Sequence, residues 1–286
     1  MEICAREHPP FLTGVKRVTA GVLATAMLVT LTATTGASQA AAQSDPRAAR
    51  SDALGVALFG ASPGTSGVSL PSSGGSAAEA PPRVDCRRVK CVALTFDDGP
   101  GRYTDTLLRH LAKYQARATF FVVGSNVVTY PRVLRRTVAA GHEIGNHTWS
   151  HPLLTRLPAS RVRSQIARTD RAVKAVAGVV PHLVRPPYGA FNRAVRRQIS
   201  RPLVLWSVDT LDWRYRNSAT VARRALRSVR PGSIILFHDI HRTTVGAMPR
   251  VLKTLAQRGY HFVTVTELFG GRPPHVAFRA APPKKS

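Results

Sequence analysis

Short apolar runs alternate with amphipathic segments from Cys91 onward, and this alternation restricts the fold more than any other feature. The runs are "CVALTF", "ATFFVVG", "HEIGNH", "HLVRPP", "PLVLWSVD", "GSIILFHD" and "YHFVTV". Helices are expected between them at Thr104–Tyr114, Pro131–Ala140, Ala159–Ala177, Asn192–Ile199, Ala219–Val229 and Val245–Arg258. Strand–helix alternation predicts parallel β/α units. About seven such strands could close into a barrel or form an open doubly wound sheet, and periodicity alone does not choose between them.

Polar residues end most of these runs. Functional side chains collect at the carboxyl ends of the strands in both kinds of parallel fold. We therefore expect one rim to bring together the polar residues that follow the strands. These are Asp97, Asp98, His147, Arg185, Asp209, Asp212 and His238.

The stretch "NHTWSH" indicates a metal site. His147 and His151 are four residues apart, and Pro152 directly after them favours a single turn or tight loop over a long helix. Two histidines and one carboxylate form a common ligand set for a catalytic divalent metal. The alternative is a pair of exposed loop histidines. The carboxylates of "TFDDGP" at a neighbouring strand end favour the metal interpretation.

The adjacent carboxylates of "TFDDGP" raise a question of charge, because neighbouring like charges repel. A bound metal ion offsets the cost of holding Asp97 and Asp98 together. One of them can ligate the ion while the other acts as base on water, whose pKa such an ion lowers to roughly 7. Gly99 and Pro100 then turn the chain away.

Five motifs occur in order: "TFDDGP", "HTWSH", "RPPYG", "DTLDW" and "ILFH". Together they resemble the motifs of the polysaccharide deacetylases, carbohydrate esterase family four, over about Cys91 to Leu268. The resemblance implies an α/β fold, a distorted (β/α) barrel with about seven parallel strands. It also implies a metal-dependent deacetylase. Zinc suits the expected ligands best, and cobalt or another first-row ion would fit the same set.

The resemblance assigns the residues around the metal. It implies that Asp97 is the catalytic base and that Asp98, His147 and His151 bind the metal. Arg185 of "RPPYG" matches the arginine that pairs with the base and orients it.

The remaining motifs supply substrate contacts. The resemblance implies that the Tyr188 backbone N–H helps to hold the oxyanion, and Pro187 lies beside it at the substrate. Trp213 matches a groove wall for a sugar ring, and Leu236 lines the pocket for the acetyl methyl group.

Amide hydrolysis also requires a proton for a poor leaving group. The resemblance implies that His238 is this general acid and that Asp212 tunes the charged partners, with Asp209 as a supporting residue. Other polar and aromatic residues match no motif. Trp206 is expected in the core, and five histidines are expected at the surface or in loops: His142, His182, His241, His261 and His275.

The N-terminal part predicts export. Lys16 and Arg17 precede an apolar stretch with an Ala-rich end, typical of a secretory signal peptide over residues 1–42. An uncleaved membrane anchor is the alternative. Residues 43–84, rich in Ser, Gly, Ala and Pro, predict a disordered linker. The catalytic domain is expected at 85–271, followed by a basic Pro-rich tail at 272–286. In an oxidising compartment, Cys86 and Cys91 would form a small-loop disulfide.

The chain carries 41 Lys and Arg against 15 Asp and Glu, a formal net charge of +26. Such a field favours polyanionic surroundings. With the export signal, it indicates an anionic cell wall rather than nucleic acid, and contact with a membrane only if the N-terminal segment stays uncleaved. We expect a secreted, wall-associated monomer that removes N-acetyl groups from peptidoglycan N-acetylglucosamine or N-acetylmuramic acid. The alternatives are a chitooligosaccharide N-deacetylase, an acetylxylan O-deacetylase, or a basic wall-binding protein without catalysis.

Overall fold

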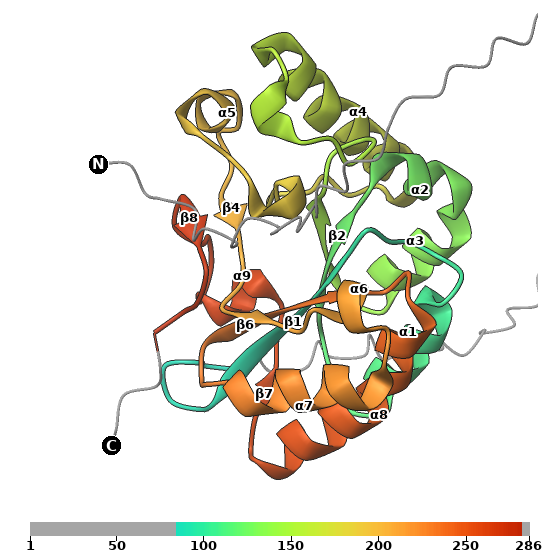
Figure 1. The fold of residues 1–286 in the computed structure, drawn as a ribbon, viewed down its shortest axis with the longest axis vertical. Coiled ribbons are helices and arrows are strands. Elements are labelled where there is room, and N and C mark those ends of the chain that lie inside the picture. Colours follow the sequence, from blue (N-terminus) through green and yellow to red (C-terminus); the bar gives the residue numbers. More distant parts are fainter. Residues whose placement is uncertain (1–83, 282–286) are drawn as a thin grey trace, which may run out of the picture. The chain divides into compact units, whose positions relative to one another are not determined.

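The computed structural model describes residues 84–281 (Figure 1). Strand β1 (Cys91–Asp97) lies at the centre of the sheet and is buried along its whole length. A strand covered on both faces reads as a continuous apolar run, and "CVALTF" is such a run. The strand order is β3-β2-β1-β6-β5, with β7 also paired to β1, and every pairing is parallel. The other strands are β2 (Thr119–Val122), β3 (Glu143–Asn146), β5 (Val208–Asp209), β6 (Ser233–His238) and β7 (His261–Phe262).

Single-residue bridges extend this sheet into a distorted barrel. Val184 bridges Asn146 of β3 on one side and Leu203 of β4 (Leu203–Val204) on the other. Strand β4 in turn pairs with β8 (Val276–Ala277). Arg279 then bridges Ser233 at the start of β6. The parallel α/β fold expected from the sequence is confirmed.

Two of the expected strands are wrong in detail. The run "HLVRPP" contributes only the bridge at Val184, and "PLVLWSVD" is divided into β4 and β5. The break has a physical cause in a buried side chain. The Arg185 guanidinium donates to the carbonyls of Val204 and Leu205, at 3.0 Å each. A side chain thus takes the place of strand partners at this point.

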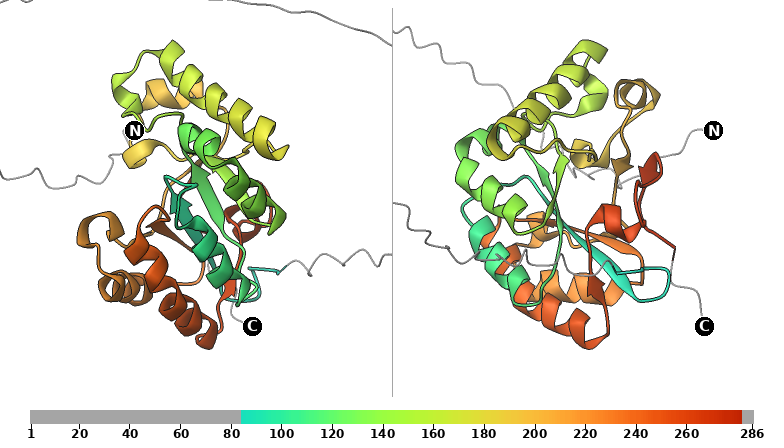
Figure 2. Two further views of the ribbon diagram at one scale, coloured as in Figure 1. Left: turned by 90° about the vertical axis from the view of Figure 1, so that its right-hand side faces the viewer. Right: turned by 180° about the vertical axis from the view of Figure 1, so that it is seen from behind.

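Helices cover the strands at the six expected places (Figure 2). These are α1 (Thr104–Ala112), α3 (Pro131–Ala139), α4 (Ala159–Ala177), α5 (Arg193–Gln198), α7 (Ser218–Ser228) and α8 (Arg242–Gln257). Short helical segments were not expected, because one turn shows no periodicity. They are α2 (Gly124–Thr129), η1 (Leu154–Arg156), η2 (Pro187–Gly189), α6 (Asp212–Tyr215) and α9 (Val265–Leu268).

The largest core cluster lies between the sheet and its helices. Phe96 of β1 stacks on Phe120 of β2 and on Phe237 of β6, with ring centroids 5.2 and 5.5 Å apart. Side chains alternate across a strand, so Thr95 and Asp97 face away from this cluster. The strand thereby turns its polar residues toward the interior of the barrel while its aromatic side chain anchors the helices.

The structure near residue 271 differs from the expected boundary between the catalytic domain and the tail. Residues 272–281 were assigned to a basic tail, but β8 lies among them and pairs with β4, so ordered packing continues past Gly271. The predicted signal segment and most of the linker lie outside the described residues. Cys86 and Cys91 form the expected disulfide. Among residues 84–281, no helix is both long and apolar enough to cross a bilayer.

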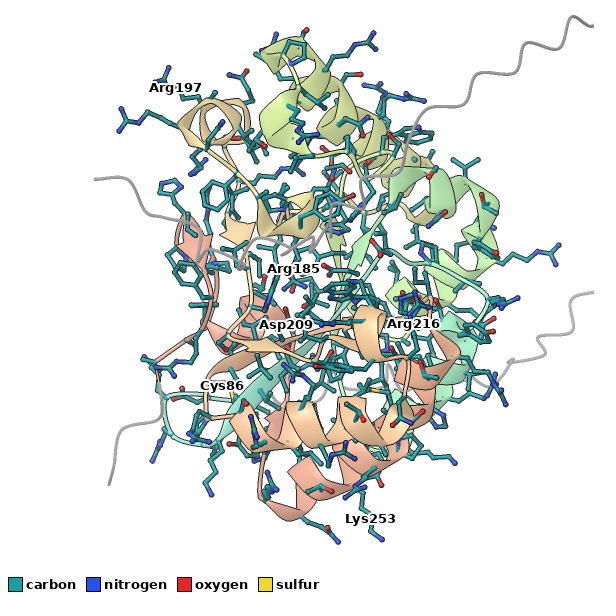
Figure 3. All side chains as sticks on the ribbon, viewed as in Figure 1. Cys86, Arg185, Arg197, Asp209, Arg216 and Lys253 are labelled. Carbon is teal, nitrogen blue, oxygen red and sulfur yellow. A yellow bond between two sulfur atoms is a disulfide. The ribbon has the colours of Figure 1, made fainter. Side chains whose placement is uncertain are left out.

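Basic side chains far outnumber their carboxylate partners. Arg197 and Lys253 lie at the periphery on α5 and α8, whereas Arg185 and Asp209 lie near the centre of the view (Figure 3). In the described region, five arginines pair with carboxylates: Arg87, Arg117, Arg136, Arg185 and Arg201. Most of the positive charge therefore remains available to anionic surroundings.

Candidate active site

The ends of β1 and β6 place the predicted base and the predicted acid side by side. Parallel pairing sets Asp97 opposite His238 and Thr95 opposite Leu236. Asp97 is 2% exposed, at the mouth of a buried strand. The expectation that polar strand ends meet on one rim is therefore confirmed for these two residues.

Asp97 is paired with a fully buried arginine. Arg185 Nη1 donates to Asp97 Oδ1 at 2.7 Å and to the Thr95 hydroxyl at 2.8 Å. The guanidinium also lies over the Phe121 ring, 4.1 Å from its centroid. Burial lowers the pKa of Arg185, and the charge of Asp97 opposes this. The arrangement fixes one carboxylate oxygen of Asp97 and leaves Oδ2 on the side of His147, 3.6 Å from its Nε2.

Asp98, His147 and His151 form the candidate metal site. One potential ligand atom from each lies within 4.8 Å of the others. Asp98 Oδ1 is 3.6 Å from His147 Nε2 and 3.4 Å from His151 Nε2. The two neighbouring aspartates thus differ in their partners: Asp97 binds the arginine and also approaches His147, whereas Asp98 approaches both histidines.

These residues fit a divalent cation. His147 Nδ1 lies 2.7 Å from the Arg185 carbonyl oxygen, which can only accept, so Nδ1 carries the proton and Nε2 presents its lone pair to Asp98. Asp98 Oδ1 is buried and, within residues 84–281, has no hydrogen-bond partner. Burial is also the main cause that lowers the pKa of His151. A buried carboxylate oxygen that faces the Nε2 atoms of two imidazoles is a donor set that a cation completes.

The histidine loop is a tight loop, as the proline predicted. Thr148 and His151 have left-handed backbones, with φ of 69° and 57°. The Thr148 hydroxyl accepts the His151 N–H at 3.1 Å, and the Asn146 side chain accepts the Thr148 N–H at 2.8 Å. Asn146 was not singled out from the sequence. Its place directly before His147 is the only signal that could have found it.

Asp212 holds His238. Its carboxylate accepts His238 Nδ1–H and the His238 backbone N–H, both at 2.7 Å, and the Thr244 hydroxyl at 2.7 Å. Burial acts to lower the pKa of His238, but the hydrogen bond and charge of Asp212 outweigh it and raise the pKa to about 9. Burial likewise acts to raise the pKa of Asp212, and the bonds from His238 and Thr244 lower it. The imidazole is thus held protonated, as a general acid requires.

The expected substrate residues surround this rim. Tyr188 is 62% exposed, and its ring packs edge-on against His151 at 4.7 Å between centroids. Trp213, on α6 directly after Asp212, is 48% exposed and free to contact a ligand. Leu236 and Pro187 are buried.

Asp209 lies one turn before α6. Its carboxylate accepts the Leu211 N–H at 2.8 Å. This contact fixes the backbone that leads to Asp212 and agrees with a supporting role.

His142, one of the histidines expected at the surface or in loops, lies between α3 and β3, and Asp239 is a carboxylate for which there was no expectation. His142 is buried, not at the surface, because it packs on Phe120 and its Nδ1 accepts the Ala118 N–H at 3.2 Å. Asp239 is fully buried beside the rim, and burial raises its pKa to about 7. Its only sequence signal was its position directly after His238.

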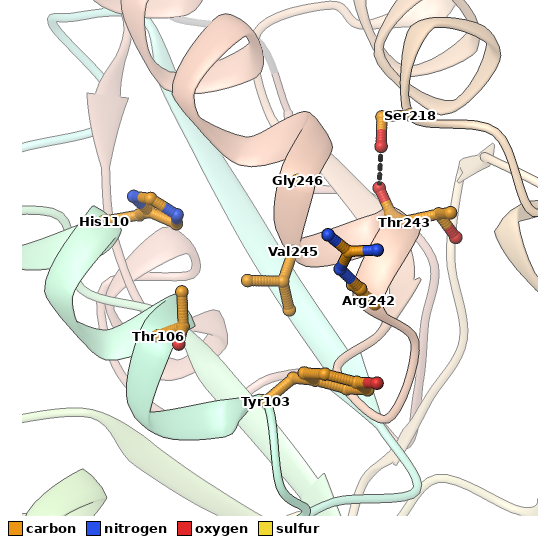
Figure 4. Close-up of a pocket in the computed structure, with 8 residues that line it drawn as sticks. All are labelled: Tyr103, Thr106, His110, Ser218, Arg242, Thr243, Val245 and Gly246. Carbon is orange, nitrogen blue, oxygen red and sulfur yellow. Dashed lines mark hydrogen bonds between the residues drawn. The ribbon is translucent and has the colours of Figure 1, made fainter.

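A separate pocket of about 590 Å³ lies between α1 and the N-terminal part of α8 (Figure 4). Its lining residues are Tyr103, Thr106, His110, Ser218, Arg242, Thr243, Val245 and Gly246. None of the predicted catalytic or metal-binding residues is among them. The chemistry therefore belongs to the rim rather than to this pocket.

Comparisons with known proteins agree with the geometry of the rim. The polysaccharide deacetylase family profile matches residues 85–202. Peptidoglycan-N-acetylglucosamine deacetylase PgdA of Listeria monocytogenes is 42% identical over 202 residues, which cover 70% of this chain and 42% of that protein. Peptidoglycan-N-acetylmuramic acid deacetylase PdaC of Bacillus subtilis is 46% identical over 180 residues, covering 63% and 38%. The chain thus spans about two fifths of the length of these relatives.

Shorter relatives are matched almost completely. The chitooligosaccharide deacetylase of Bradyrhizobium sp. is 32% identical over 203 residues, which cover 64% of this chain and 93% of that protein. A solved structure of T48 deacetylase with substrate is 49% identical, with a TM-score of 0.66, and covers 68% of this chain and 99% of that one. The fold and the rim define a polysaccharide deacetylase domain. The chain belongs to the polysaccharide deacetylase family.

Proposed function

We propose that the protein is a secreted, metal-dependent deacetylase that hydrolyses N-acetyl groups of a cell-wall glycan. The observation that carries the proposal is one rim that holds a cation ligand set, an arginine-bound carboxylate and a carboxylate-bound imidazole. Each group has a separate task in amide hydrolysis. A non-catalytic wall-binding protein would have no use for this combination.

The ligand set would hold a divalent cation through Asp98, His147 and His151. The ion would supply Lewis-acid chemistry, which would polarise the acetyl carbonyl and lower the pKa of a water molecule. Zinc suits two imidazoles and one carboxylate, and cobalt is the nearest alternative.

The chain's own residues move the protons. Asp97 takes the proton of the attacking water, while Arg185 prevents the carboxylate from rotating away. The Tyr188 N–H stabilises the developing oxyanion, and the buried Leu236 side chain accommodates the acetyl methyl group. His238, held protonated by Asp212, donates a proton to the departing amine.

Peptidoglycan is the proposed substrate. The relatives PgdA and PdaC are named for N-acetylglucosamine and N-acetylmuramic acid of peptidoglycan, and the chain's charge of +26 suits an anionic wall. Chitooligosaccharide is the second candidate, because the Bradyrhizobium relative named for it is matched over 93% of its length.

Acetate release tests the proposal. The protein is loaded with Zn²⁺ and assayed on peptidoglycan, chitin oligomers and acetylxylan, with Asp97→Asn as the matched inactive control. The proposal is supported if the unaltered protein releases acetate from peptidoglycan and Asp97→Asn does not. Release from chitin oligomers or acetylxylan alone transfers the function to that substrate, and no release from any of them supports the non-catalytic alternative.

A further inference from the structure

Asp239 is a buried carboxylate that the mechanism does not use. It follows His238 at the end of β6 and is fully inaccessible to solvent. Its Oδ1 is buried and has no hydrogen-bond partner among residues 84–281. Because an unpaired buried oxygen costs stability, a carboxylate at this position needs a reason other than the stability of the fold.

The Asp239 carboxylate lies directly against the loop that carries Asp98. A Cβ atom placed on Gly99 would lie 2.4 Å from Asp239 Oδ1 and 2.6 Å from Oδ2. No side chain fits between them, so position 99 has glycine because of this close approach. The Asp239 carboxylate thus sterically limits where the backbone after Asp98 can lie.

Thr104 connects the Asp239 carboxylate to the end of the loop that carries Asp98. The buried Thr104 hydroxyl donates to Asp239 Oδ2 and accepts the Gly101 N–H at 2.9 Å. The chain from Gly101 through Thr104 to Asp239 therefore joins the metal-ligand loop, the start of α1 and the end of β6.

The loop has a conformation that requires such support. Asp98 has a left-handed backbone, with φ of 71°, which is unfavourable for a residue other than glycine. The Asn126 side chain donates to the Asp98 carbonyl at 2.7 Å, and the Val123 N–H donates to the Gly99 carbonyl at 3.0 Å. These contacts hold the first half of the loop, and Asp239 with Thr104 holds the second half.

We propose that Asp239 is a positioning residue for the metal ligand Asp98, acting through Thr104 and through its contact with Gly99. The inference rests on the metal site of the proposed function. Residues that support metal ligands typically change metal affinity by about 10–100-fold when they are removed. The effect should appear in metal binding itself and not only in turnover.

The test is the Zn²⁺ dissociation constant, measured by competition with a chromophoric chelator. Asp239→Ala should weaken Zn²⁺ binding by about 10–100-fold. Thr104→Val should also weaken it, and the double variant should bind no more weakly than Asp239→Ala alone, because both changes break the same connection. Asp239→Asn keeps an oxygen that can accept from Thr104, so its Zn²⁺ affinity should stay close to that of the unaltered protein.

Thr137→Val is the matched control. Its buried hydroxyl bonds only the Val133 carbonyl within α3, at 3.0 Å, so its removal should leave Zn²⁺ affinity unchanged. The thermal midpoint of each metal-free variant separates folding from binding. A folded Asp239→Ala variant with unaltered affinity would overturn the inference. If that variant does not fold, unaltered affinity in Thr104→Val overturns it instead. If the unaltered protein binds no Zn²⁺, the metal site itself is wrong and the inference falls with it.

Discussion

Asp97 and His238 occupy the same register position on neighbouring parallel strands, as the last residues of β1 and β6. Their backbones are therefore adjacent, yet their side chains have opposite partners. Asp97 is bound by a cation, Arg185, and His238 by an anion, Asp212. This opposite pairing suits the proposed roles of Asp97 as base and of His238 as acid.

Asp97→Asn should keep the metal and lose turnover. The change removes the proposed base but none of the three candidate ligands. Loss of a general base typically costs about 10²–10⁴-fold in rate. Metal stoichiometry and kcat, measured on the same sample, check both parts. Loss of the metal in this variant would show that the two aspartates have exchanged roles.

His147→Ala and His151→Ala should each abolish stoichiometric metal binding. Their Nε2 atoms both face Asp98 Oδ1, at 3.6 and 3.4 Å, so each deletion removes a third of the protein ligands. Elemental analysis after dialysis measures the result, and His182→Ala, at an exposed position, is the control. Full retention of metal in both variants would contradict the site.

Asp212→Asn should move the alkaline limb of the pH–rate profile to lower pH. Asp212 raises the pKa of His238 to about 9, so removal of its charge should return that pKa toward the ordinary value of roughly 6.5. The measurement is kcat/KM between pH 5 and 10. An unchanged limb would exclude His238 as the acid.

The same pair should stabilise the fold in a defined pH range. The pKa of His238 is higher in the folded state than in the unfolded chain. The contribution of the raised His238 pKa is therefore complete below about pH 6.5 and is lost as the pH rises through about 9. The free energy of unfolding is measured with denaturant at pH 6 and at pH 10. Its difference between the two pH values should be smaller in Asp212→Asn than in the unaltered protein.

His142 should make the fold sensitive to acid. Burial lowers its pKa to about 4, so the folded protein keeps this imidazole neutral while the unfolded chain binds a proton at about pH 6.5. Stability should fall as the pH drops from 6.5 toward 4, by up to about 3 kcal/mol. His142→Asn should show a shallower decline, and His182→Asn, at an exposed position, should decline like the unaltered protein.

Salt should distinguish charge attraction from chemistry. With a net charge of +26, binding to anionic peptidoglycan should weaken as salt rises, because exposed charges are screened beyond about 10 Å at 0.1 M. The proposed proton transfers of Asp97 and His238 would act at contact distance and should change little. We expect kcat/KM to fall with salt on peptidoglycan and to stay nearly constant on a neutral chitin oligomer. If kcat/KM fell equally with salt on both substrates, the net charge would no longer support peptidoglycan as the substrate.

The site was more predictable than the details of the fold. Asp97, Asp98, His147 and His238 follow apolar runs, and parallel strands bring their ends together whatever the exact topology. The break between β4 and β5 could not be predicted, because it depends on a side chain distant in sequence. Local patterns contain no information on such a contact.

The burial of individual polar side chains also could not be predicted from the sequence. His142 precedes a strand and reads as a loop residue, but the Phe120 ring covers it in the fold. Asp239 closely approaches Gly99, which lies 140 residues earlier in the chain. Neither contact leaves a pattern in the surrounding sequence.

The Arg185 guanidinium has two roles that substitution of this residue cannot separate. It binds the carbonyls of Val204, the last residue of β4, and of Leu205, and it holds the Asp97 carboxylate. A selection that scored cellular abundance and activity independently would find both lost together at position 185. At position 97 the change to Asn, which keeps an acceptor for Arg185, would separate the two scores, because the proposed role of Asp97 lies in the reaction. A mutational map would therefore record Arg185 as a folding residue and miss its proposed part in catalysis.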